Sequence, residues 1–278
     1  MLDQLALRFY VDILKANVKF LIMKQDKKHI VIITDCKDVA YNEMRWIIIR
    51  ECSKMGYNNI DVELVPVSEF SIINAAFLTR LMAEHCLPGT ILSLVINPQK
   101  NRSARIYGKL PNGIIYFGAN TGALTWLLQD FDVQEIYEIH DPGFVSFGGK
   151  YVHAPNVAKL VAGVQFEKIG KKFPKGSLTE LDIKDGTIVH IDNFGLMKIK
   201  NKTPLFKEGE KLQIFKNGKY VLDATFANRM MSLNDKEWAL YPGSSLNSLP
   251  ELGTVRYKEG FKEIDAHIGD TITWKPIK

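Results

Sequence analysis

The sequence predicts a chain in two parts, an α/β unit with a mostly parallel sheet followed by a small all-β unit. Up to about residue 164, short apolar runs rich in β-branched residues alternate with segments of helical period. Beyond that point the helical period disappears, and short strands separated by turn residues take its place. A length of 278 residues with a hydrophobic fraction of 46% allows two domains with a core in each.

The chain begins with a predicted helical extension, residues 1–28. Leu2, Leu5, Phe9 and Ile13 recur at helical spacing, which predicts an amphipathic helix that ends near residue 22. Charged residues interrupt every apolar run that a signal peptide or a membrane span would need. We therefore expect this helix to pack on its own domain or on a neighbouring subunit, and we expect no membrane partner.

Residues 29–164 predict the α/β unit. The run HIVIIT over His29–Thr34 has the composition of a strand buried on both faces. Residues 42–54 carry apolar residues on one helical face, and Gly56 follows them. We expect this glycine to end that helix. In chain order, the same reasoning gives strands at 29–34, 62–67, 89–96, 114–118 and 135–140, and helices at 42–54, 72–85, 121–129 and 154–162.

The all-β unit is expected over residues 182–278, after a linker at 165–181 that is rich in lysine, glycine and proline. The dipeptide Asn217-Gly218 stands between two apolar runs, which is typical of a two-residue β-hairpin. A small barrel or a sandwich fits this pattern. The expected strands are 186–192, 196–200, 211–215, 219–224, 237–241 and 270–274.

Composition narrows the classes of function. The net charge of +5 comes from dispersed residues, and without a basic stripe we expect no nucleic-acid partner. Three cysteines without CxxC spacing and six scattered histidines predict neither disulfides nor a metal site, so we expect a cytoplasmic protein. The glycine-rich cradles of dinucleotide and phosphate sites are absent from the sequence.

Polar residues follow three of the predicted strands. Ligands of open parallel sheets bind at the carboxyl ends of the strands, so Asp35, Asn97 and Asn120 are candidate binding residues. Each also has a structural interpretation, because Asp35 and Asn120 could cap helices and Asn97 could belong to a turn. Gly148 and Gly149 would allow a backbone to approach a ligand closely.

Seven short blocks carry the strongest functional signal. They are Thr34-Asp35-Cys36-Lys37, Asn74-Ala75-Ala76-Phe77, Pro88-Gly89-Thr90-Ile91 through Asn97-Pro98, Ile115-Tyr116-Phe117-Gly118-Ala119-Asn120-Thr121-Gly122, Ser146-Phe147-Gly148-Gly149 through Ala154-Pro155, Ile191-Asp192-Asn193-Phe194-Gly195-Leu196, and Gly243-Ser244-Ser245-Leu246. In order and spacing they resemble the S-adenosylmethionine (SAM) hydroxide adenosyltransferase family, which also contains the fluorinases and chlorinases. The resemblance spans residues 29–278.

This resemblance implies a Rossmann-like N-terminal domain, a C-terminal β-barrel and a homotrimer with sites between neighbouring subunits. The reaction of such proteins is attack of a nucleophile on the ribose C5′ of SAM, which expels methionine. With water as the nucleophile the product is adenosine. SAM is then the substrate or ligand, and no further cofactor is implied.

The resemblance also implies roles for individual residues. Asp35 corresponds to the ribose-binding carboxylate, and a ring that faces the adenine comes from Phe70 or Phe194. Asn97 and Arg102 correspond to groups that hold the water, which makes them the candidate catalytic residues. The remaining candidate substrate-binding residues are Asn120, Phe147, Ser244 and Ser245.

Two departures from the family pattern bear on activity. The water-activating Asp and His are replaced by Asn97 and Gly148, and an amide cannot accept a proton from water. Loss of a positioned base typically lowers a rate by roughly 10²–10⁴-fold. Two hypotheses follow: a divergent SAM hydrolase, or a catalytically silent SAM- or adenosine-binding or interaction protein. Halide use is disfavoured, because the hydroxyl donor expected at Gly149 is missing.

Overall fold

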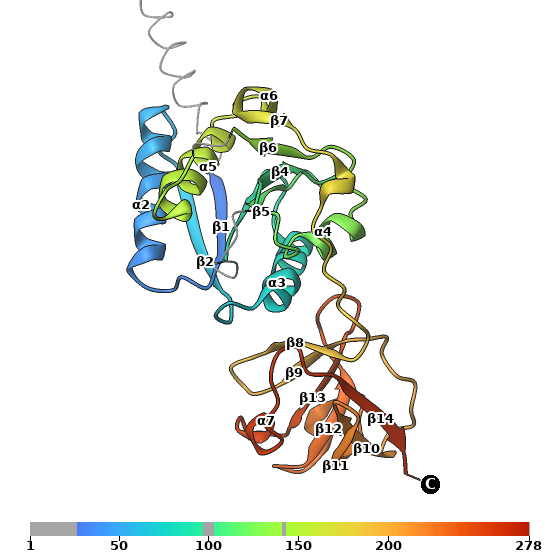
Figure 1. Ribbon diagram of the computed structural model, residues 1–278. Helices are drawn as coiled ribbons and strands as arrows, with labels where there is room; N and C mark the ends of the chain where they lie inside the picture. The colour runs from blue at the N-terminus through green and yellow to red at the C-terminus, as the bar shows by residue number, and fades with distance from the viewer. Residues whose placement is uncertain (1–26, 97–102, 141–142, 278) are drawn as a thin grey trace, which may run out of the picture.

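The computed structural model describes residues 27–96, 103–140 and 143–277, which fold into two sheets with helices (Figure 1). The predicted N-terminal amphipathic helix, Asn97 and Arg102 lie outside the described residues. Among the helices that are described, none is both long enough and apolar enough to span a membrane. The predicted fold class is confirmed, with an α/β sheet followed by a curled all-β sheet.

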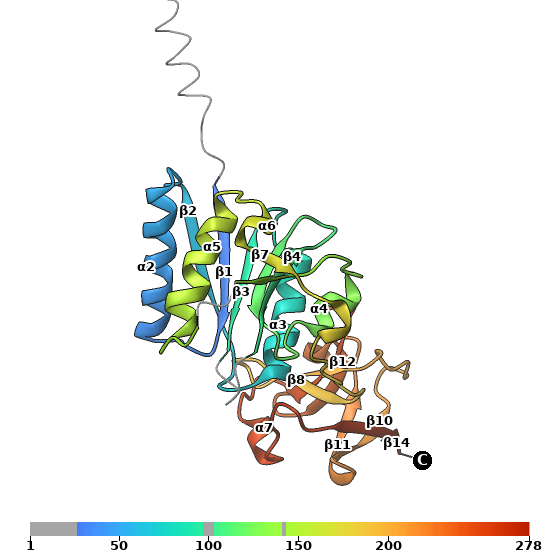
Figure 2. The same cartoon turned by 45° about the horizontal axis from the view of Figure 1, so that its top comes forward.

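The N-terminal sheet has the order β2-β1-β3-β5-β4-β6-β7. Strands β1, β2, β3, β5 and β6 run in one direction, and β4 and β7 run against them. Helices α2 and α5 cover one face, whereas α3 and α4 cover the other (Figure 2). The bounds are β1 Lys28–Thr34, α2 Val39–Lys54, β2 Ile60–Pro66, α3 Ile72–His85, β3 Ile91–Val95, β4 Arg105–Lys109, β5 Ile115–Ala119, α4 Thr125–Asp130, β6 Tyr137–Ile139 and α5 Ala154–Val161.

The starts and ends of the first helices follow from local chemistry. Asp38, not Asp35, caps α2, because its carboxylate accepts a hydrogen bond from the Ala40 amide at 3.0 Å. The Ser71 hydroxyl caps α3 in the same way by accepting from the Asn74 amide. Gly56 has a φ of +85°, so the helix end predicted from this glycine is confirmed. Asp35 is therefore left for other partners.

The segment predicted as a linker extends the N-terminal sheet. Residues 165–181 hold α6 (Phe166–Ile169), β7 (Gly170–Lys172) and a short 3-10 turn at Lys175–Ser177. Strand β7 pairs antiparallel with β6 at the sheet edge. The sequence did not predict this strand, because its two lysines are exposed and give it no apolar face. Exposed lysines also protect an edge strand from further pairing. Strand β4 was also not predicted.

The C-terminal sheet is a curled half-barrel with the order β14-β10-β11-β12-β13-β9-β8. An isolated bridge between Thr187 and Thr271 brings its two edges together. The hairpin predicted at Asn217-Gly218 is confirmed, because both residues have positive φ. The bounds are β8 Thr187–Ile191, β9 Met197–Lys200, β10 Lys211–Lys216, β11 Lys219–Phe226, β12 Trp238–Pro242, β13 Pro250–Thr254, α7 Gly260–Glu263 and β14 Ile272–Pro276.

The docking of β7 generates a stability prediction. A Cβ atom at Gly170 would collide with the Glu138 carbonyl oxygen, whereas one at Gly176 would meet nothing within 4 Å. Gly170→Ala should therefore lower the free energy of unfolding by about 1–3 kcal/mol, as overpacked sites do. Gly176→Ala, its matched control, should change it by less than about 1 kcal/mol. Urea unfolding measures both, and equal stabilities would contradict the docked position of β7.

Candidate functional site

Asp35 and Phe70 meet where β1 and β2 end. The Phe70 amide donates a hydrogen bond to Asp35 Oδ2 at 3.0 Å. Phe70 has a φ of +56°, a left-handed conformation that costs free energy for a residue with a side chain. Its ring is 66% exposed. The loop therefore presents a carboxylate and an aromatic ring together at the carboxyl edge of the sheet. That the two residues bind a ligand stays a prediction.

Residues 147–149 pass over the same edge beside α2 and β3. A Cβ atom at Gly149 would press on Met44, Phe147 and Val95, so only glycine fits there. A Cβ atom at Gly148 would collide with the guanidinium of Arg105. The side-chain space next to Gly148 is thus filled by an arginine that the sequence analysis did not single out.

Arg105 begins β4 and lines a polar cavity of about 400 Å³. Lys171 and Glu138 line the same cavity and pair with each other at 2.9 Å. His140, which directly follows β6, is the imidazole in the cavity wall. The cavity therefore combines a fixed positive charge with an imidazole, a side chain that can accept a proton. Its other lining residues are Ser103, Ala104 and Ile139.

His153 lies buried behind this edge, in a single π-helical turn over Gly149–His153. Its ring meets Phe117 edge-on, with centroids 4.7 Å apart. Nδ1 has no hydrogen-bond partner among the described residues. Burial, helped by the positive charge of Arg105, lowers the pKa of His153 to about 3, so the imidazole is neutral in the folded protein.

Phe194 lines an apolar cavity of about 400 Å³ in the C-terminal sheet. The carboxylate of Asp192 shapes the turn by accepting the Phe194 amide at 2.9 Å and the Leu196 amide at 3.0 Å. The Phe194 ring is 64% exposed. This cavity is a second place for a flat ring. Its other lining residues are Leu196, Met230, Met231, Thr254, Arg256, Tyr257 and Lys258.

The other candidate residues have mainly structural partners. The Asn120 side chain donates to the Ser177 carbonyl and accepts from the Thr179 amide, so it clamps the crossing to the C-terminal sheet. Ser245 is buried, and its carbonyl accepts from the Leu249 amide, whereas Ser244 is exposed. A role for these three residues in ligand binding stays a prediction.

The two sheets join through the start of α3. Asn74 is 1% exposed, and its side-chain amide donates to the Val189 carbonyl at 3.0 Å and contacts His190 Nδ1 at 2.9 Å. Val189, Leu246 and Leu249 belong to the same apolar cluster as α3 and α4. The half of the site on the N-terminal sheet and the cavity on the C-terminal sheet are thus parts of one packed unit.

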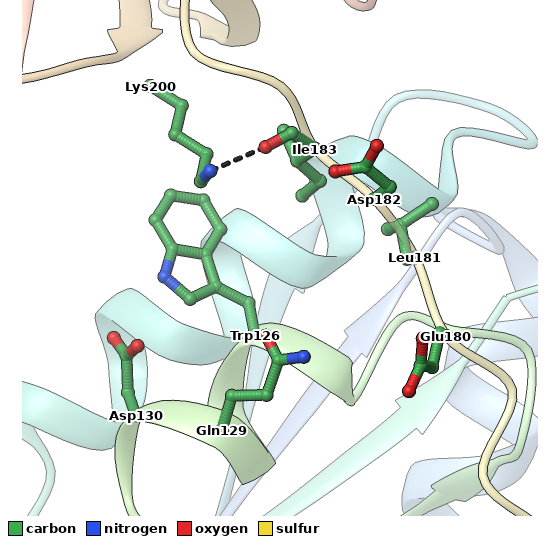
Figure 3. Close-up of a pocket in the computed structure, with 8 residues that line it drawn as sticks. All are labelled: Trp126, Gln129, Asp130, Glu180, Leu181, Asp182, Ile183 and Lys200. Atoms are coloured by element: carbon green, nitrogen blue, oxygen red, sulfur yellow. Dashed lines mark hydrogen bonds between the residues drawn. The ribbon is translucent and has the colours of Figure 1, made fainter.

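A further cavity of about 380 Å³ lies between α4 and the chain that enters the C-terminal sheet (Figure 3). Lys200 lies over the Trp126 ring and donates to the Ile183 carbonyl. Asp130 is paired with Arg80 at 2.6 Å. This cavity shares no lining residue with the candidate site. The remaining residues around it are Gln129, Glu180, Leu181 and Asp182.

One group of metal-type ligands occurs among the described residues. His29, Asp61 and Glu63 lie on neighbouring strands β1 and β2. The Lys27 ammonium already pairs with Asp61 at 2.6 Å. His29 lies at the amino end of β1, so this group is at the edge of the sheet opposite to Asp35.

Comparison with known proteins identifies the family. The model of the SAM hydroxide adenosyltransferase N-terminal domain matches residues 30–170, which is about half of the chain and contains Asp35, Arg105 and Gly148. The chain belongs to this family. The resemblance found in the sequence blocks is thereby confirmed. A search of curated proteins finds no match.

Solved structures support the fold. An uncharacterized conserved protein from Thermotoga maritima is similar with a TM-score of 0.77 and 19% identity, over 88% of this chain and 100% of that chain. A conserved hypothetical protein from Thermus thermophilus is similar with a TM-score of 0.71 and 15% identity, over 89% of this chain and 100% of that chain. At such identities these similarities bear on the fold alone.

The burial of His153 predicts a dependence of stability on pH. Because the folded pKa lies below the ordinary value of 6.5, the unfolded chain binds the extra proton first, and stability falls as the pH drops below that value. Between pH 7 and pH 5 this histidine should lower the free energy of unfolding by about 2 kcal/mol. His153→Phe keeps a ring against Phe117 and should remove that part of the fall, as measured by urea unfolding at both pH values.

His85, an exposed histidine, provides the matched control. Between pH 7 and pH 5, the free energy of unfolding of His85→Gln should fall as much as that of the wild type. If His153→Phe loses as much stability on acidification as His85→Gln, the neutral buried state of His153 is wrong.

Proposed function

We propose that this chain is a SAM hydrolase, which transfers the adenosyl group of SAM to water and releases adenosine and methionine. Membership of the SAM hydroxide adenosyltransferase family supports the substrate. The observation that carries the proposal is the pairing of Asp35 with Phe70 at the carboxyl edge of the sheet. A carboxylate there binds ribose hydroxyls through charge-assisted hydrogen bonds, and a ring beside it covers the nucleoside.

Hydrolysis of SAM requires few catalytic groups from the protein. The water oxygen attacks C5′, the C5′–S bond breaks, and its electron pair leaves with the sulfur of methionine. The sulfonium is a good leaving group, so no general acid is needed. The protein has to align the water with the bond that breaks and to receive one proton from the water.

Arg105 and His140 are proposed for this task in place of the family's missing base. Gly148 leaves space for the Arg105 guanidinium, which would hold the oxygen of the water or of the hydroxide that forms. His140 lines the same cavity and would accept the proton. Asn97, which closely follows β3 in the sequence, remains the proposed orienting amide.

A homotrimer would complete the site. Phe70 and Phe194 are each about two-thirds exposed, and such rings on a lone chain suggest a covering surface. We propose that the edge with Asp35 faces the Phe194 cavity of a neighbouring copy. Two different surfaces that meet in this way close into a ring when the rotation from one copy to the next is that of a closed symmetry.

A silent SAM- or adenosine-binding protein is the second candidate. Asn97 and Gly148 stand where the family has its water-activating Asp and His, and both replacements remove a proton acceptor. Such a protein would keep the contacts of Asp35 and lose turnover. Product analysis separates the two candidates.

Asp35→Asn tests the site. The amide oxygen can still accept from the Phe70 amide, so the loop should hold, but the negative charge toward the ribose is lost. The KM for SAM should rise at least about tenfold. It is measured from the release of adenosine, which chromatography detects. Asp38→Asn is the matched control, because the Asp38 carboxylate caps α2 and asparagine can cap it equally well, so the KM for SAM should stay unchanged. Equal behaviour of the two variants would exclude Asp35 from the site.

His140→Gln tests the proposed proton acceptor. Glutamine keeps a polar side chain but cannot take a proton, so kcat should fall by about 10²-fold or more with little change in KM. His85→Gln, at an exposed histidine outside the site, should retain the wild-type kcat. A His140→Gln variant with wild-type kcat would assign the proton to another acceptor.

A further inference from the structure

The orientation of the Asn74 side chain is fixed by its neighbours. Its oxygen accepts from the Ser68 amide at 2.9 Å, and its nitrogen donates to the Val189 carbonyl at 3.0 Å. Reversing the amide would set oxygen against oxygen at Val189 and nitrogen against nitrogen at Ser68. The nitrogen therefore also faces His190 Nδ1, at 2.9 Å.

This orientation determines the state of His190. Because the Asn74 nitrogen can only donate, Nδ1 of His190 has to accept, and the imidazole is the neutral form that carries its proton on Nε2. A second proton on Nδ1 would place two donors against each other. The hydrogen bond is thus present only while His190 is uncharged.

The surroundings of His190 favour that neutral form. Its ring stacks on Phe77 of α3, with centroids 5.7 Å apart. Burial lowers the pKa of His190, and the Lys198 ammonium on β9 lowers it further. The carboxylates of Asp192 on the following turn and Glu251 on β13 act in the opposite direction. Glu251 is itself paired with Lys198, which offsets its charge.

The Asn74–His190 contact lies between the two halves of the candidate site. On one side, the Asn74 oxygen holds Ser68 in the loop whose Phe70 amide donates to Asp35. On the other, His190 is two residues before Asp192, whose carboxylate shapes the turn with Phe194. One side-chain amide thus touches both the loop that carries Phe70 and the strand that leads to Phe194.

Resting on the proposed function, we propose that Asn74 and His190 are positioning residues whose hydrogen bond sets the angle between the two sheets, and with it the two half-sites, only while His190 is neutral. A ring of subunits closes only at one such angle. Acidification that protonates His190 therefore loosens the site without touching any ligand contact.

The experiment is a calorimetric titration of adenosine at pH 8 and at a pH below the midpoint of the His190 titration followed by NMR, with the full chain and three variants. His190→Asn keeps an acceptor that does not titrate, His190→Leu removes the acceptor, and Asn74→Asp replaces the donor with a carboxylate. The wild type should bind about fivefold more weakly at the lower pH, the effect of one hydrogen bond. His190→Asn should bind equally at both pH values, and His190→Leu weakly at both.

Asn74→Asp should raise the pKa of His190, because a carboxylate at position 74 stabilises the protonated ring. The carboxylate cannot donate to the Val189 carbonyl, so adenosine should bind more weakly than to the wild type at pH 8. The His190 ring signal, followed by NMR over the same pH range, reports this pKa directly.

Three outcomes decide the matter. Wild-type affinity in His190→Leu at pH 8, or unchanged pH dependence in His190→Asn, overturns the positioning role alone. A His190 titration that is the same in the wild type and in Asn74→Asp overturns the hydrogen bond itself. Absence of adenosine binding by the wild type at pH 8 overturns the proposed function, and the positioning role with it, while the NMR titration still tests the hydrogen bond.

Discussion

The buried amide of Asn74 is the contact on which the arrangement of this molecule depends. It lies in the first turn of α3, ties down the loop before that helix, and reaches the first strand of the C-terminal sheet. An amide that is 1% exposed has to find partners for all its polar atoms, and here those partners come from both sheets. The apolar cluster that contains Val189, Leu246 and Leu249 seals the same junction. The two sheets are therefore joined by specific hydrogen bonds as well as by apolar packing.

The sequence predicts best those elements whose apolar period is strong. HIVIIT lies within β1, and the helix expected over residues 72–85 has the same bounds in the structure. Strands β4, β7 and β13 were missed, because each is short and breaks the apolar pattern with glycine, lysine or proline. Gly170 in β7 illustrates why such strands are hard to predict. Its pairing with β6 leaves no room for a Cβ atom, and this long-range constraint produces no local sequence pattern.

The candidate site was predictable to the same degree. Asp35 follows a strong strand, so its place at the carboxyl edge could be inferred, and the structure adds Phe70 as its hydrogen-bond donor. Arg105 could not be inferred, since its contact with Gly148 joins residues from a missed strand and a distant loop. That contact gives the glycine at position 148 a structural role. The resemblance predicts a histidine at this position, whereas the glycine leaves space for Arg105, so a histidine there would displace the guanidinium.

We propose that this member of the SAM hydroxide adenosyltransferase family binds and hydrolyses SAM, although Asn97 and Gly148 stand where the resemblance predicts an Asp and a His. Calorimetric titration of SAM into the wild-type protein, with chromatography of the cell contents afterwards, tests it most directly. A hydrolase should give sustained heat after each injection, and adenosine and methionine should be recovered. A saturable isotherm with intact SAM would contradict the hydrolase and favour the silent binding protein, and no heat at all would contradict SAM binding.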